Sequence, residues 1–294
     1  MPNVTANGIQ IEYDTFGDNS SPALLLVMGG GSQMIFWEVE FCELLAKRGH
    51  FVIRFDNRDI GLSTKFEKAG IPDIMAATKG EHVNPAYTLD DMADDAVGLL
   101  DVLGIETAHI CGASVGGMIA QVISYRHPER ILSLTSIMSS TGNPELPQIE
   151  PDVLAEVYKP VPDERDAYIE HHVNMWRKHW SPGFPFNEKR LRTLMSESYD
   201  RSYYPQGMAR QSAAVLAHGY QRLSIASIKV PTLVIHGNKD PFMPIEGGKE
   251  TAQLIPGAKL LIIDGMGHDM PQEAWPEIID AISNHTMRAN VQSK

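Results

Sequence analysis

Short apolar runs alternate with helical patterns over most of this chain, and this alternation is the feature that most constrains its fold. The runs are nearly continuous, which is typical of parallel strands covered on both faces. We expect strands at residues 23–28, 51–55, 108–111, 131–137, 232–236 and 259–263. Asn7-Gly8, between two short apolar segments, predicts a tight hairpin at the sheet edge. The pattern predicts an α/β fold with a mainly parallel central sheet and helices on both faces.

Helical patterns separate these predicted strands. We expect helices over residues 36–48, 115–125 and 273–284, the last with Pro276 near its first turn. Another helix begins after Thr88, which is followed three residues later by Asp91 as in a capping box.

The alternation stops between residues 143 and 226. This segment begins with several prolines, lacks strong strand signals and is rich in aromatic side chains. We predict a helical cap at 143–226, inserted into a core domain formed by residues 1–142 and 227–294. Aromatic and methionine side chains offer large, adaptable apolar surfaces, so we expect the cap to supply much of the substrate pocket. The pocket candidates are Trp176, Trp180, Phe184, Phe186 and Tyr204, some of which only fill the cap's own core.

The segment GASVGG at residues 112–117 contains the pattern G-x-S-x-G around Ser114. An apolar strand pattern precedes it and a helical pattern follows it, which is the context that an exposed nucleophilic serine requires. The small glycines permit a sharp turn, and the helix N-terminus brings a positive dipole end to the site. We predict that Ser114 is a nucleophile.

A serine hydroxyl is a weak nucleophile and needs a base, which in turn needs a carboxylate to orient it. His268 lies in a glycine-rich loop beyond a late strand, and Asp240 follows the strand before that one. The order Ser114, Asp240, His268 is the order of α/β-type serine hydrolases. Asp264 is the rival acid, four residues before His268, and we favour Asp240.

Acyl transfer also needs preorganised N–H donors for the developing oxyanion. The Val115 amide, directly after the nucleophile, is one candidate. The second comes from the glycine run at residues 29–31, where the backbone can approach a substrate closely. We assign Gly30, with Gly31 as the less favoured alternative.

Composition excludes several other classes of protein. The net charge of −12 disfavours binding to nucleic acids and to anionic membrane surfaces. No apolar run is long enough to span a membrane, and we see no signal peptide. The two cysteines cannot form a disulfide framework or a four-cysteine zinc site, and no residue cluster has metal-ligand spacing. We therefore predict a soluble, cytoplasmic protein that acts on a small molecule without a metal, as a monomer or homodimer.

Four segments together resemble the α/β-hydrolase superfamily: LLLVMGGG, GASVGG, LVIHGNKDPFMP and IIDGMGHDMP. Within it, the chain looks most like carboxylesterases of the aclacinomycin methylesterase type. Met28 stands where many relatives have histidine, and Asp59 where most have glycine. The resemblance implies a cofactor-free serine esterase with a helical cap, in which Arg58 and Asp59 brace loops beside the glycine run without being catalytic.

The predicted function is therefore hydrolysis of a small-molecule carboxylic ester through Ser114, His268 and Asp240 and an acyl-enzyme. One alternative is perhydrolase or haloperoxidase chemistry without a cofactor, in which peroxide replaces water. An acyltransferase and a C–C bond hydrolase are further enzyme alternatives. A noncatalytic ligand receptor is the alternative from another class, because fold alone does not imply function.

Overall fold

The computed structural model describes residues 1–292, and these contain one eight-stranded sheet. All six strands predicted from apolar runs are present, with ends that differ by at most two residues. The strands are β1 (Asn3–Ala6), β2 (Ile9–Phe16), β3 (Ala23–Val27), β4 (Phe51–Phe55), β5 (Ala108–Ala113), β6 (Ile131–Ile137), β7 (Thr232–Gly237) and β8 (Lys259–Ile263).

The strand order across the sheet is β1-β2-β4-β3-β5-β6-β7-β8. The first two strands form the predicted antiparallel hairpin, whose turn residues Asn7 and Gly8 both have positive φ. β2 pairs antiparallel with β4, and every later pair is parallel. The carboxyl ends of six strands therefore meet at one edge of the sheet, where α/β proteins place their ligands.

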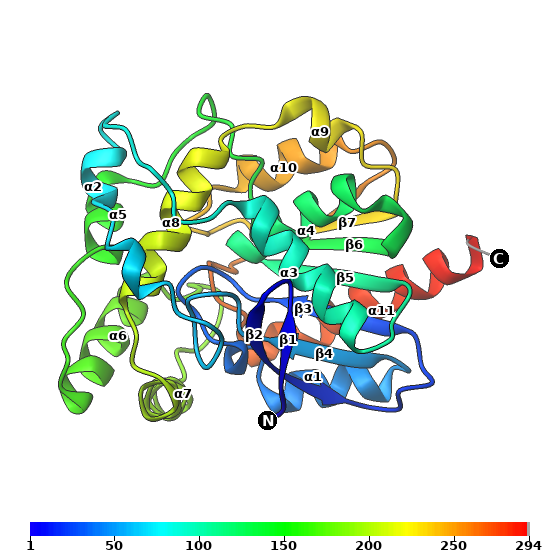
Figure 1. Ribbon diagram of the computed structural model, residues 1–294, viewed down its shortest axis with the longest axis horizontal. Coiled ribbons are helices and arrows are strands. Elements are labelled where there is room, and N and C mark those ends of the chain that lie inside the picture. The colour runs from blue at the N-terminus through cyan, green and yellow to red at the C-terminus, as the bar shows by residue number, and fades with distance from the viewer. Residues whose placement is uncertain (293–294) are drawn as a thin grey trace.

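Helices cover both faces of the sheet (Figure 1). Outside residues 143–226 they are α1 (Val39–Lys47), α2 (Ile74–Ala77), α3 (Leu89–Val102), α4 (Val115–Arg126), α10 (Ile245–Leu254) and α11 (Trp275–Gln292). Short 3₁₀ turns occur at η1 (Met34–Phe36), η2 (Glu67–Ala69), η3 (Pro128–Arg130) and η4 (Gln272–Ala274). No helix within residues 1–292 is long and apolar enough to cross a membrane.

Alternate side chains of β3 pack into two separate clusters. Leu25 and Val27 join the cluster beneath α3 and α4, whereas Leu24 and Leu26 join the one beneath α1 and α11. This is the period of two expected of a strand buried on both faces. Edge strand β8 departs from the expectation, because two of its apolar side chains, Leu260 and Ile262, are exposed.

Two predicted helices have other boundaries in the structure. The helix predicted from residue 36 begins at Val39, because Trp37 (ψ 84°) and Glu38 (ψ 149°) have non-helical backbones that separate a short 3₁₀ turn from α1. The helix predicted at 273–284 begins at Trp275 and continues to Gln292. Contacts with the sheet hold its extra turns, including one from His285 Nε2 to the Leu134 carbonyl at 3.1 Å. The capping box at Thr88 is confirmed.

Residues 143–226 contain five helices and no strand in this fully described segment. Figure 1 shows α5 to α8 gathered beside one end of the sheet. Four side chains of α6 and α7, among them Val173 and Met195, form a small core of their own. The division into a core domain and a cap stays a prediction, and we call residues 143–226 the predicted cap. Its helices are α5 (Pro151–Val157), α6 (Arg165–His179), α7 (Glu188–Arg201), α8 (Gln206–His218) and α9 (Arg222–Ala226).

Candidate active site

Ser114 is the single residue between β5 and α4. Its backbone has φ 55° and ψ −125°, a strained conformation of the kind that costs on the order of 1–3 kcal/mol and is concentrated at functional sites. Two glycines permit the turn. A Cβ on Gly112 would lie 2.1 Å from the Gly116 carbonyl oxygen, and a Cβ on Gly116 would lie 2.1 Å from the Val27 carbonyl oxygen. The local sequence therefore folds into the strand–turn–helix arrangement that exposes a nucleophilic serine.

The loops after β7 and β8 bring Asp240 and His268 to this serine. His268 Nε2 lies 2.9 Å from Ser114 Oγ, and His268 Nδ1 lies 2.7 Å from Asp240 Oδ2. An ionised carboxylate only accepts hydrogen bonds, so the imidazole proton belongs on Nδ1. Nε2 is then left free to accept the serine hydrogen, as nucleophile activation requires.

Asp240 has a fully buried side chain. Its Oδ1 accepts hydrogen bonds from the Phe242 and Met243 amides at 2.9 and 2.8 Å, which fixes the direction of Oδ2. The rival Asp264 instead accepts a hydrogen bond from Asn238 Nδ2 at 2.6 Å. The structure thus brings Asp240, and not Asp264, into contact with the histidine.

The glycine run at residues 29–31, which we call the oxyanion loop, packs directly against the serine turn. A Cβ on Gly29 would lie 3.1 Å from Ser114 Cβ, and one on Gly30 would lie 3.1 Å from Val115 Cγ2. The Val115 amide begins α4, where a helix leaves its first N–H groups without an intrahelical partner. The Gly31 amide donates to Gln211 Oε1 at 2.9 Å and is already occupied. The oxyanion roles of Gly30 and Val115 stay predictions.

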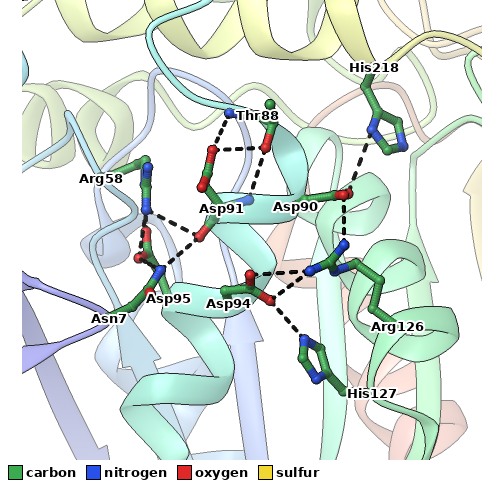
Figure 2. Close-up of polar contacts among 10 residues, drawn as sticks. All are labelled: Asn7, Arg58, Thr88, Asp90, Asp91, Asp94, Asp95, Arg126, His127 and His218. Carbon is green, nitrogen blue, oxygen red and sulfur yellow. Dashed lines mark hydrogen bonds and ion pairs between the residues drawn. The ribbon is translucent and has the colours of Figure 1, made fainter.

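Arg58 and Asp59 both form buried ion pairs beside the oxyanion loop. Arg58 holds Asp95 of α3, with Nε 2.6 Å from Oδ2, and Figure 2 shows Asn7 on the same carboxylate. Asp59 pairs with Arg210 of α8 at 2.8 Å. Asp59 also has φ 69°, a conformation that favours glycine, and its carboxylate accepts the Phe66 amide at 2.7 Å. These side chains brace loops, as the sequence led us to expect.

A segment of the predicted cap contacts the histidine loop, and sequence reasoning missed it. Ser181 Oγ accepts the Gly267 amide at 2.7 Å and donates to Asp269 Oδ1 at 2.8 Å. Asp269 is buried, and this burial raises the pKa of its carboxyl to about 6. The residues on both sides of His268 are therefore held by one serine. No motif around Ser181 signals this contact.

Trp176, one of the five predicted pocket aromatics, contacts the aromatic ring that packs against His268. Its ring centroid is 5.8 Å from that of Phe242, which in turn is 5.3 Å from the His268 imidazole. Trp176 is thus separated from the candidate base by one aromatic ring.

The other four aromatics have packing partners elsewhere. Trp180 and Phe186 contact each other with ring centroids 5.3 Å apart, and Phe184 packs against the α1–α11 core cluster. Tyr204 lies beneath the Arg210 guanidinium. The structure therefore disperses these four, and their role as pocket residues stays a prediction.

A cavity of about 430 Å³ lies between α4, the start of the predicted cap, the end of α8 and the loop after β7. Its lining includes none of the five predicted aromatics. None of Ser114, Asp240 and His268 lines it. Its lining includes Met118, one helical turn beyond Ser114, and Phe242, whose ring contacts that of His268. Its apolar lining includes Met118, Val122, Leu146, Val215 and Phe242.

Within residues 1–292, the structure shows neither a metal-binding group of side chains nor a disulfide. No three His, Cys, Asp or Glu side chains of this range are grouped to hold a metal ion. Cys42 and Cys111 are both free and buried, and burial raises the pKa of each thiol.

Residues 22–273 match the profile of a protein family described as the alpha/beta hydrolase fold. Rhodomycin D methylesterase DauP of Streptomyces sp. (strain C5) is 29% identical, and the match covers 98% of each chain. Rhodomycin D methylesterase DnrP of Streptomyces peucetius is 28% identical over the same share of each chain. These relatives confirm the resemblance to methylesterases.

Solved structures of low identity share the fold. The meta-cleavage product hydrolase from Pseudomonas fluorescens IP01 superposes with a TM-score of 0.76 at 20% identity, covering 98% of each chain. The enol-lactonase from Burkholderia xenovorans LB400 gives 0.71 at 23% identity, covering 99% of this chain and all of the other.

Proposed function

This chain belongs to the α/β-hydrolase family, and we propose that it is a serine carboxylesterase that hydrolyses a small-molecule ester. The observation that carries the proposal is the hydrogen-bonded series from Ser114 Oγ through His268 to Asp240, at 2.9 and 2.7 Å. The matches to two methylesterases over nearly the whole chain support the same class of reaction.

Acylation follows from the groups in this series. Ser114 Oγ attacks the ester carbonyl carbon while His268 Nε2 takes the serine proton, and the carbonyl oxygen becomes an oxyanion. The Gly30 and Val115 amides donate to that oxyanion, and the α4 N-terminus adds its positive dipole end. His268 then gives its proton to the leaving alkoxide, which departs as the alcohol.

Deacylation repeats these steps with water. His268 takes a proton from water, whose oxygen attacks the acyl-enzyme, and Ser114 leaves with the proton returned by His268. Asp240 keeps the imidazole in the Nδ1–H form and stabilises the imidazolium in both halves of the reaction. This scheme needs no metal and no organic cofactor.

The larger half of the ester fits the cavity of about 430 Å³ beyond Met118 and Phe242. Apolar side chains predominate in its lining, and polar ones such as Gln121 and Tyr125 are interspersed among them, as is usual in a small-molecule site. We therefore propose a bulky, largely apolar ester as substrate. Because two relatives over nearly the whole chain are named rhodomycin D methylesterases, we propose methyl esters as the first class to test.

A hydrolysis screen with methyl esters and aryl esters of increasing acyl size tests this proposal. We expect the wild type to hydrolyse several of them, and Ser114→Ala to lose turnover by about a millionfold while keeping its fold. Far-ultraviolet circular dichroism and the melting temperature serve as folding controls. A folded Ser114→Ala variant with near-native turnover, or a wild type inactive on every ester, would overturn it.

A further inference from the structure

The oxyanion loop is held by a side chain of the predicted cap. Gln211 of α8 is buried, with 1% of its surface exposed. Its Oε1 accepts the Gly31 amide hydrogen at 2.9 Å, and its Nε2 donates to the Arg58 carbonyl at 2.9 Å. One side-chain amide thus connects the loop after β3 with the loop after β4, and both of its polar ends are occupied.

Other contacts fix α8 independently of this bond. Arg210, the preceding residue, forms the buried ion pair with Asp59. A Cβ on Gly207 would lie 2.0 Å from the Asp59 carbonyl oxygen, so the first turn of α8 lies against that loop without a side chain between them. At the other end of the helix, His218 Nε2 lies 3.2 Å from the Tyr125 hydroxyl (Figure 2 shows its contact with Asp90 of α3). Gln211 therefore projects from a helix anchored at both ends.

The bond to Gln211 determines how the oxyanion loop presents its amides. Three consecutive glycines have no Cβ to restrict their torsions, and Gly31 has φ 71°. Holding the Gly31 N–H restrains the peptide plane between Gly30 and Gly31, which adjoins the plane that carries the Gly30 N–H. It also occupies the Gly31 N–H, which leaves Gly30 as the donor that the sequence assigned to this loop. Oxyanion stabilisation depends on donors oriented before the reaction begins.

We propose that Gln211 is a positioning residue of the oxyanion hole, through which the predicted cap acts on the chemical step as well as on substrate selection. The proposal rests on the serine esterase function proposed above. It assigns no catalytic contact to Gln211 itself, which acts through the Gly31 amide.

Gln211→Met tests this role, because methionine fills the same space without a hydrogen-bonding amide. Ser212→Ala is the matched control: it lies on the same helix and loses a hydrogen bond from Tyr158 and one to the Met208 carbonyl, neither of which involves an atom of the oxyanion loop. For each protein we would measure kcat and KM on an aryl ester. We would also measure the rate at which an alkyl fluorophosphonate labels Ser114, followed by intact mass.

Removing one oxyanion donor costs about 100- to 1,000-fold in kcat, and a donor that is misaimed but present should cost about 10- to 50-fold. We expect kcat and the labelling rate of Gln211→Met to fall together by that factor, with KM and all Ser212→Ala values within about twofold of wild type. Gln211→Asn, whose side chain is too short to reach Gly31 but keeps a polar amide, should behave as Gln211→Met does and replaces it if that variant does not fold.

Three results would overturn the inference. One is a folded Gln211 variant that labels as fast as wild type. Another is a loss that appears in KM and leaves kcat unchanged, and the third is an equal loss in Ser212→Ala. Labelling by the fluorophosphonate distinguishes failure of the Gln211 inference from failure of the proposed function. A wild type that is neither labelled nor able to hydrolyse esters would contradict both.

Discussion

Replacing Asp240 with asparagine tests the catalytic assignment at the atom that orients the histidine. Asp240 Oδ1 accepts the amide hydrogens of Phe242 and Met243 at 2.9 and 2.8 Å. In Asp240→Asn the remaining side-chain oxygen must keep this position, since an NH₂ group there would face two donors. The NH₂ group then occupies the position of Oδ2, which is 2.7 Å from His268 Nδ1.

The asparagine therefore presents a donor where His268 also donates. The imidazole relieves this by moving its proton from Nδ1 to Nε2, so that Nε2 faces Ser114 with a hydrogen and cannot take the serine proton. A histidine held in the wrong tautomer costs about 10⁴-fold in kcat. At 1.36 kcal/mol for each factor of ten, this is about 5.4 kcal/mol of lost transition-state stabilisation.

The assay is steady-state hydrolysis of an aryl ester by wild type, Asp240→Asn and Asp264→Asn. Asp264 contacts Asn238 rather than the histidine, so its variant should keep kcat within about threefold of wild type. The reasoning is refuted if Asp240→Asn keeps more than about one hundredth of wild-type kcat. A larger loss in Asp264→Asn would show that the acid was wrongly assigned.

Two further predictions concern the cavity and the sheet core. Met118→Trp should fill part of the cavity, so the ratio of kcat/KM for bulky acyl esters to kcat/KM for acetate esters should fall by at least about tenfold. An unchanged ratio would show that the substrate does not occupy this cavity. Burial lowers the pKa of His109 to about 4, so between pH 6.5 and 4 the unfolded chain binds a proton that the folded chain does not, and stability falls as pH falls. His109 alone should lower the free energy of unfolding by up to about 3 kcal/mol between pH 7 and pH 4.5, as measured by urea unfolding. The decrease in His109→Gln should be smaller by this amount. An equal decrease in both proteins would contradict this origin.

Local patterns in the sequence were sufficient for the strands, the hairpin and the serine turn. Each depends on features within a few residues: short continuous apolar runs, the turn geometry of Asn7-Gly8, and the glycines at 112 and 116 that leave room for the backbone around Ser114. The chain order of Ser114, Asp240 and His268, each just beyond a strand, was enough to predict that they share one edge of the sheet, because parallel strands end there together.

Tertiary structure alone decided which residues support that machinery. Gln211 and Gly31 are 180 positions apart, and Ser181 and Gly267 are 86 apart. No local periodicity links such pairs, since their contacts exist only once the predicted cap has packed against the sheet. The same holds for the cavity, which is lined by α4 and the cap entry rather than by the five aromatics that composition favoured. Composition reports how much apolar surface a segment carries, whereas the direction in which each side chain points depends on helix packing across the whole chain.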